Sequence, residues 1–246
     1  MKKVDILYNN NFLISCVEPT LFGSFVEHLG RCMYRGIYEP EHSQADENGF
    51  REDVKMLIAE LGVTAIRYPG GNFVSGYNWK DGIGPKEKRP IRKELAWGGL
   101  ETNQVGMDEF LPLLKEMKIE PLLAVNMGTG TLTEARELVE YCNGRHTTWA
   151  KIRKENGHEE PYKVRYFCLG NEMDGEWQIG MHTAEEYARK LKETAKIVKW
   201  AEPEAKIIAC GSCTNEIGHV TFGEWDNIIL DEAYDYIDYL SIHRYY

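Results

Sequence analysis

The sequence predicts an α/β fold in which helices cover a parallel sheet. Strand-like segments alternate with amphipathic helical patterns along the whole chain. The strand segments are near-continuous apolar runs, as expected of strands that are buried on both faces. Polar side chains stand at the carboxyl ends of several of these runs. The predicted strands cover residues 21–27, 63–68, 121–126, 164–170, 206–211 and 237–243.

Four helices are predicted between these strands. The first covers residues 50–61, where apolar residues recur on one face and Gly62 provides a stop. A second helix covers residues 108–118. Two more begin at capping boxes, Thr131-x-x-Glu134 and Thr183-x-x-Glu186, and extend to about residues 142 and 200. The polar stretch 75–106 is expected to lack regular structure, and residues 6–8 and 12–16 are weak strand candidates.

Two architectures fit such an alternation, a doubly wound open sheet and a (β/α)8 TIM barrel. Five polar residues lie at the carboxyl ends of five different predicted strands: Glu27, Asn72, Asn126, Glu172 and His243. In a barrel those strand ends converge on one mouth, where barrel enzymes place their chemistry, whereas an open sheet spreads them along an edge. We therefore predict a TIM barrel, incomplete here because only about six of its eight β/α units are predicted.

Composition limits the class of protein. With 246 residues, 43% of them hydrophobic, the chain can form a substantial core, and its net charge of −10 disfavours nucleic acid or an anionic membrane as a partner. We expect the six cysteines to be free buried thiols, because the chain is not a small disulfide scaffold. No apolar run reaches the roughly 18 residues of a membrane span, so a cytoplasmic protein without a membrane partner is expected.

The segment from Gly170 to Trp177 is the most informative for function. Asn171 and Glu172 directly follow an apolar strand, and a carboxylate in that position needs a partner or a chemical role. Glu172 suits a general acid that protonates a leaving oxygen, while Asn171 suits a contact to a substrate hydroxyl. Trp177 can supply a stacking wall for a sugar ring.

Further candidates stand at the other strand ends. Glu27 is either a ligand contact or the partner of Arg67 in a structural ion pair. Asn72 closes a Pro-Gly-Gly-Asn turn, whose glycines permit close backbone approach. Trp97 lies in the long polar stretch and is a candidate pocket wall.

The last predicted strand adds one more candidate. His243 and Tyr245 alternate there and so share one face, which places a phenol within reach of a catalytic carboxylate.

Cofactor chemistry is poorly supported. Gly128-Thr129-Gly130 lacks the third glycine and the acidic residue of a dinucleotide motif. A metal site built from His28, Glu27 and His243 lacks the histidine spacing of common zinc motifs. We expect neither a cofactor nor a metal.

Four motifs resemble glycoside hydrolase family 51, the intracellular α-L-arabinofuranosidases. The resembling stretches are Phe22-Gly-Ser-Phe-Val-Glu-His-Leu-Gly-Arg31, Arg67-Tyr-Pro-Gly-Gly-Asn-Phe73, Gly170-Asn-Glu-Met-Asp-Gly175 and Leu240-Ser-Ile-His-Arg-Tyr-Tyr246. With the spacing between them, they cover essentially the whole chain.

The resemblance implies a retaining hydrolase that releases terminal α-L-arabinofuranosyl residues from arabinose-containing oligosaccharides. Glu172 is then the general acid/base. Sugar contacts and pocket walls are implied for Glu27, Asn72, Asn171, Tyr245, Trp97 and Trp177.

The resemblance also bears on domains and assembly. It places the nucleophile on barrel strand seven, beyond the last predicted strand, so we expect residues 1–246 alone to be inactive. It assigns residues 1–20 to an accessory β-sandwich, residues 21–246 to the barrel, and a homohexamer to the full-length enzyme. Two alternatives are a non-catalytic sugar-binding or scaffolding fragment and a related barrel glycosidase such as a β-xylosidase.

Overall fold

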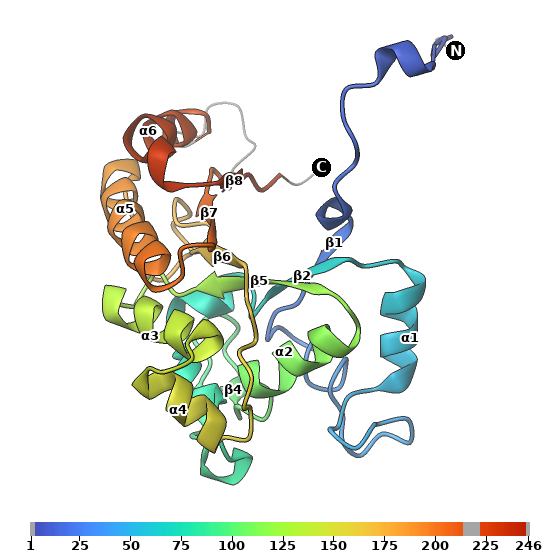
Figure 1. Cartoon of the computed structure of the whole chain (residues 1–246), viewed down its shortest axis with the longest axis vertical. Helices are drawn as coiled ribbons and strands as arrows, with labels where there is room; N and C mark the ends of the chain where they lie inside the picture. Colours follow the sequence, from blue (N-terminus) through green and yellow to red (C-terminus); the bar gives the residue numbers. More distant parts are fainter. Residues whose placement is uncertain (1–2, 214–221, 245–246) are drawn as a thin grey trace.

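The computed structural model describes residues 3–213 and 222–244, and its main feature is a curled parallel sheet (Figure 1). Six strands pair in the order β1-β2-β5-β6-β7-β8, each parallel to its neighbours. Their bounds are β1 Gly23–Phe25, β2 Ala65–Tyr68, β5 Glu120–Val125, β6 Tyr166–Leu169, β7 Lys206–Cys210 and β8 Tyr239–Ser241.

The strand order separates the two predicted architectures. A doubly wound sheet reverses its strand order at a switch point, but here the spatial order follows the chain order throughout. When each parallel strand lies beside the one before it in the chain, the right-handed connections between them curl the sheet in one direction, toward a barrel. The predicted TIM barrel is therefore confirmed, incomplete over the described residues.

The helices cover the outside of this curled sheet. Their bounds are α1 Glu52–Glu60, α2 Met107–Glu116, α3 Leu132–Asn143, α4 Thr148–Glu155, α5 Ala184–Ala201 and α6 Glu224–Ala233. Helix α5 packs against both α3 and α6, and together they form an outer layer along one side of the sheet (Figure 1). The predicted capping boxes are present at Thr131 and Thr183 and begin α3 and α5.

The core follows the period-two alternation of the strands. Leu123 and Phe167 point outward into the main apolar cluster beneath the helices. Ala124 and Cys168, one residue further along each strand, belong to a second, smaller cluster on the other face. Arg67 of β2 lies near Cys168 and so also belongs to this inner face. The candidate residues lie beyond this inner face, at the carboxyl ends of the strands.

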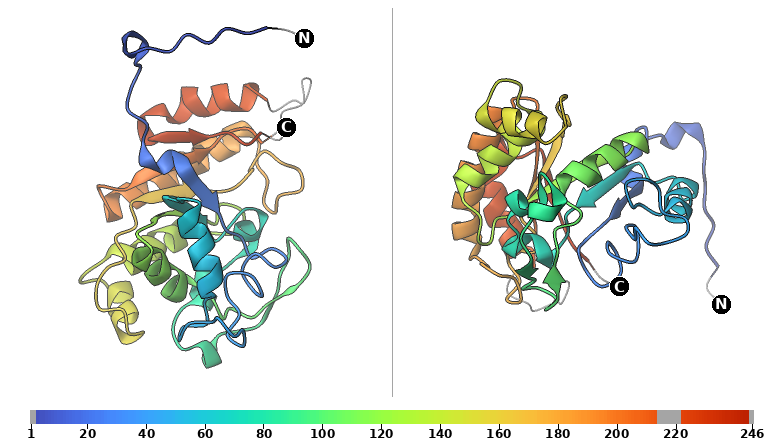
Figure 2. Two further views of the ribbon diagram at one scale, coloured as in Figure 1. Left: turned by 90° about the vertical axis from the view of Figure 1, so that its right-hand side faces the viewer. Right: turned by 90° about the horizontal axis from the view of Figure 1, so that it is seen from below.

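Several parts differ from the predictions. The expected strands at residues 6–8 and 12–16 are wrong, because that segment is extended apart from a 3-10 turn at Asn10–Phe12. Its apolar side chains are exposed, with Ile14 fully so. Figures 1 and 2 show it projecting away from the sheet. Apolar alternation does not make a strand where no neighbouring strand satisfies the backbone.

Other differences are helices and turns that the patterns did not reveal. The first strand begins at Gly23 because Pro19–Phe22 forms a 3-10 turn. Helices α4 and α6 were not predicted. The long polar stretch contains three 3-10 turns and a short hairpin of β3 (Arg92–Lys93) and β4 (Leu100–Glu101), so the expectation of no regular structure there is wrong.

Two further features agree with composition. All six cysteines are free, and four of them are buried, although Cys16 is exposed and Cys32 is half-buried. Within residues 3–213 and 222–244, no helix combines the length and apolarity needed to cross a bilayer.

Candidate active site

Glu172 lies at the carboxyl end of β6, where the chain turns sharply. Gly170 and Glu172 both adopt left-handed backbone conformations, with φ of 97° and 46°. A side chain at Gly170 would approach Met173 Cγ to 2.8 Å, so the turn requires glycine there. The left-handed conformation of Glu172 is uncommon for a residue with a Cβ and is often found at functional sites.

Two ring nitrogens hold the Glu172 carboxylate. Trp177 Nε1 donates to Oε2 at 2.9 Å, and His243 Nδ1 donates to Oε1 at 3.0 Å. Glu172 is only 8% exposed, whereas the Trp177 ring is half exposed. The carboxylate is thus oriented by the protein and reached from the mouth of the sheet.

The charge state of Glu172 follows from these contacts. Burial raises its pKa, but the hydrogen bonds from His243 and Trp177, together with electrostatic interactions with His243 and Arg67, lower it by more. The net result is a pKa below the ordinary value for glutamate. Glu172 is therefore ionised at neutral pH.

Asn171 contacts strand β2 and the turn that follows it. Its Oδ1 accepts a hydrogen bond from Arg67 Nη2 at 2.8 Å, and its Nδ2 donates to Asn72 Oδ1 at 3.2 Å. Asn171 is 2% exposed. The two bonds fix which way its amide faces.

Glu27 is buried at the end of the first strand and is held by two donors. The Phe73 backbone N–H donates to Oε1 at 2.9 Å, and Trp97 Nε1 donates to the same oxygen at 3.1 Å. The predicted alternative, an ion pair with Arg67, is wrong among the described contacts, because Arg67 donates to Asn171 instead.

The Pro-Gly-Gly-Asn turn makes room for this carboxylate. A Cβ at Gly70 would lie 2.4 Å from Glu27 Cγ, and one at Gly71 would lie 3.0 Å from Glu27 Oε2. Gly70 also has a φ of 134°, which other residues avoid. The glycines therefore allow close approach of backbone to Glu27, as predicted.

The six described candidates lie at the carboxyl ends of the strands in three hydrogen-bonded sets, which chain neighbours join at Asn72–Phe73 and Asn171–Glu172. Glu27 and Glu172 lie at the same edge, because all strands between them are parallel. Each carboxylate accepts a hydrogen bond from a half-exposed tryptophan. The seventh candidate, Tyr245, lies outside the described residues.

Two residues of the site were missed or assigned differently. The sequence analysis placed His243 at a strand end but predicted that Tyr245 would contact the catalytic carboxylate. In the structure His243 itself contacts the Glu172 carboxylate. Arg67 was considered only as a partner for Glu27. Both residues stand at strand ends, which was the available signal.

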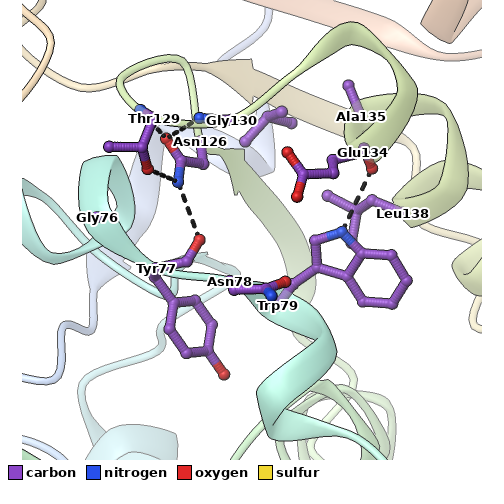
Figure 3. Close-up of a pocket in the computed structure, with 11 residues that line it drawn as sticks. Gly76, Tyr77, Asn78, Trp79, Asn126, Thr129, Gly130, Glu134, Ala135 and Leu138 are labelled. Carbon is purple, nitrogen blue, oxygen red and sulfur yellow. Dashed lines mark hydrogen bonds between the residues drawn. The ribbon is translucent and has the colours of Figure 1, made fainter. Parts of the chain in front are cut away.

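Asn126, also at a strand end, has a different role. Its Oδ1 accepts from the Thr129 and Gly130 N–H groups, and its Nδ2 donates to the Tyr77 carbonyl (Figure 3). It lines a cavity of about 80 Å³ between α3 and the turn at Trp79, and none of the candidate sugar contacts lines that cavity. Asn126 therefore shapes a turn outside the candidate site.

The two histidines of the metal site considered from the sequence, His28 and His243, have different partners. His28 contacts Glu101 and Tyr68, whereas His243 contacts Glu172. Over the described ranges, no three His, Cys, Asp or Glu side chains are grouped in a way that could hold a metal ion.

A curled parallel sheet with a polar group at its carboxyl edge is the arrangement of the TIM-barrel proteins. Comparison with known proteins defines the group further. Residues 57–246 match the family described as "Alpha-L-arabinofuranosidase 1 domain". The chain belongs to the α-L-arabinofuranosidases of glycoside hydrolase family 51.

Individual relatives agree with this assignment. The chain is 51% identical over 247 residues to the "Intracellular exo-alpha-(1->5)-L-arabinofuranosidase 1" of Bacillus subtilis, covering 100% of this chain and 49% of the relative. A family 51 α-L-arabinofuranosidase structure from Bifidobacterium longum superimposes with a TM-score of 0.91 at 53% identity, over 94% of this chain and 45% of that one.

An arabinose complex of the α-L-arabinofuranosidase from Thermotoga maritima gives a TM-score of 0.85 at 49% identity, over 90% and 45% of the two chains. The chain spans about half the length of the curated relatives it matches.

Proposed function

We propose that this chain provides the acid/base part of a retaining α-L-arabinofuranosidase that removes terminal arabinofuranosyl residues from arabinose-containing oligosaccharides. The observation that carries the proposal is the buried Glu172 carboxylate, held by Trp177 and His243 beside the Arg67–Asn171–Asn72 chain. The Bacillus subtilis relative is named for exo action on α-(1→5) linkages. We extend that linkage to this chain.

The proposed mechanism requires Glu172 to change protonation during the cycle. A retaining glycosidase first uses an acid to protonate the leaving oxygen and then a base to activate water. The lowered pKa of Glu172 fits the second step. For the first step, an ionised nucleophile nearby raises the pKa of Glu172, and its consumption in the glycosyl-enzyme removes that effect.

The neighbouring side chains have proposed roles in binding. Asn171 and Asn72 present amides, and Glu27 a carboxylate, to the sugar hydroxyls, with Tyr245 as a further contact. Trp97 and Trp177 form walls whose half-exposed rings fit a stacked sugar. A neutral sugar needs no electrostatic attraction, so the net charge of −10 is compatible with this substrate.

Four features of the whole enzyme belong to the same proposal. The nucleophile is assigned to strand seven of the barrel, and residues 1–20 to an accessory β-sandwich. A cytoplasmic location and a homohexamer follow from the family resemblance. The relative from Bacillus subtilis is itself named intracellular.

The test is Glu172→Gln in the native protein, compared with Glu176→Gln, an exposed glutamate of the same loop. We expect Glu172→Gln to slow hydrolysis of α-(1→5)-arabino-oligosaccharides by about 10²–10⁴-fold. Nitrophenyl α-L-arabinofuranoside should lose less in the glycosylation step, because its leaving group needs little protonation.

Two further results bear on the same residue. Azide should restore turnover of the nitrophenyl substrate, since a small anion replaces the water that a base must activate. Equal losses on both substrates at the glycosylation step, or the same loss in Glu176→Gln, would contradict the proposed role of Glu172.

A further inference from the structure

We propose that His28 and Glu101 form a buried positioning pair that holds two hydrogen-bond donors, the Phe73 amide and the Trp97 indole, against Glu27. The inference rests on the proposed function, where Glu27 contacts the sugar. It concerns residues outside the candidate site, which the sequence motifs did not explain.

The pair itself is buried and highly connected. His28 Nδ1 lies 2.8 Å from Glu101 Oε2, and the two side chains are only 1% and 5% exposed. Tyr34 and the Asn103 N–H donate to Oε1 of the same carboxylate. Burial raises the pKa of Glu101, but the His28 contacts, together with Tyr34 and Asn103, lower it by more. The carboxylate is thus ionised and satisfied without solvent.

His28 controls one of the two donors to Glu27. It directly follows Glu27 in the chain, and its ring stacks on Phe73 with centroids 4.6 Å apart and an interplanar angle of 8°. The backbone N–H of that Phe73 donates to Glu27 Oε1. A shift of the imidazole therefore moves the residue that holds the carboxylate.

Glu101 controls the other donor. It ends β4, and the turn of the β3–β4 hairpin presents Trp97, whose indole donates to the same Oε1. The hairpin has only two residue pairs, and so short a ladder is marginal without other contacts. Another tether, the Arg92–Asp81 ion pair, leaves Arg92 60% exposed. Buried Glu94 accepts hydrogen bonds from the Ala96 and Trp97 N–H groups, but these bonds lie within the turn. Glu101 is the buried side chain of the hairpin that binds it to the segment after β1.

Both donors thus depend on one hydrogen-bonded pair, whose two residues come from segments 73 residues apart. Because the two bonds converge on Oε1, they fix the rotation of the Glu27 carboxylate as well as its place. Loss of the pair should disorder Trp97 and weaken sugar binding, while leaving the acid/base group untouched.

The experiment uses the native protein labelled with 5-fluorotryptophan, in which the Trp97 resonance is identified by its loss in Trp97→Phe. The test variant is Glu101→Gln. The matched control is Asp108→Asn, which removes another buried carboxylate that accepts bonds from tyrosine hydroxyls and a backbone N–H, on helix α2. Calorimetry with L-arabinose provides the binding measurement.

We expect Glu101→Gln to shift and broaden the Trp97 resonance and to weaken L-arabinose binding by about 3- to 10-fold, the value of about one hydrogen bond. His28→Phe keeps a ring on Phe73 but loses the bond to Glu101, and should shift the same resonance. Asp108→Asn should leave it in place, even if it lowers stability.

An unchanged Trp97 resonance in Glu101→Gln and His28→Phe, or an equal change in Asp108→Asn, would overturn the positioning role. The fluorine signal keeps this outcome separate from the proposed function. Failure of the unmutated protein to bind L-arabinose would count against the function, and the Trp97 resonance would still decide the role of the pair.

Discussion

Removal of the Tyr187 hydroxyl should destabilise the junction between β6 and β7, next to the candidate site. Tyr187 lies on α5 and is fully buried. Its hydroxyl donates to the Leu169 carbonyl at 2.6 Å and accepts from the Cys210 N–H at 2.8 Å. Burial raises the pKa of Tyr187 well above its ordinary value, so the phenol remains a donor at neutral pH.

The size of the effect follows from the two orphaned groups. Tyr187→Phe retains the ring stacked on Trp225, with centroids 5.3 Å apart, and so leaves little cavity. Each buried backbone group that loses its partner costs about 1–3 kcal/mol. Because one buried hydroxyl is removed at the same time, we expect a net loss of about 2–4 kcal/mol in the free energy of unfolding.

The assay is urea unfolding of the native protein, with hydrogen exchange of the Cys210 amide as the local measurement. Tyr234→Phe is the control, because that ring is 71% exposed and its change should stay within about 0.5 kcal/mol. A loss below about 1 kcal/mol, with unchanged exchange at Cys210, would refute the reasoning.

Two further predictions concern the carboxylates. His243→Ala should raise the pKa of Glu172 relative to the unmutated protein, because burial then loses its main opposing contact; the carboxyl titration followed by ¹³C NMR checks this, with exposed His146→Ala as control. The lowered pKa of Glu172 stabilises the fold at pH values above the ordinary glutamate pKa of 4.5, and this stabilisation disappears as the pH falls through the lowered pKa. The loss of stability in His243→Ala should therefore be largest near neutral pH and shrink in acid. Gly70→Ala should abolish detectable L-arabinose binding by calorimetry, because its Cβ would lie 2.4 Å from Glu27 Cγ, whereas Gly99→Ala, with open space around it, should bind normally.

Much of the fold was predictable because its signals are local. Helices α3 and α5 begin at capping boxes, which are set by residues three apart. The apolar strands with polar residues at their carboxyl ends predicted both the barrel and the edge on which Glu27 and Glu172 both lie. Those features depend on alternation and composition within one segment.

Contacts between distant segments could not be derived in this way. Trp97 and Glu27 are 70 residues apart, and His243 and Glu172 are 71 apart. No local pattern states that an indole or an imidazole will reach a particular carboxylate, because the curl of the sheet brings them together. The lowered pKa of Glu172 is a product of these same contacts.

The sequence by itself determined the order of the six sheet strands, four of the helices between them and the residue types at the strand ends, because periodicity and chain order are sufficient for these. It also indicated strands at residues 6–8 and 12–16 that do not form, since a strand exists only where a neighbour satisfies its backbone. Only the tertiary structure decided that Arg67 orients Asn171 rather than pairing with Glu27, and that His28 and Glu101 meet in the interior. In both cases the physical reason is burial, which makes each polar group take whichever partner the packing places within reach.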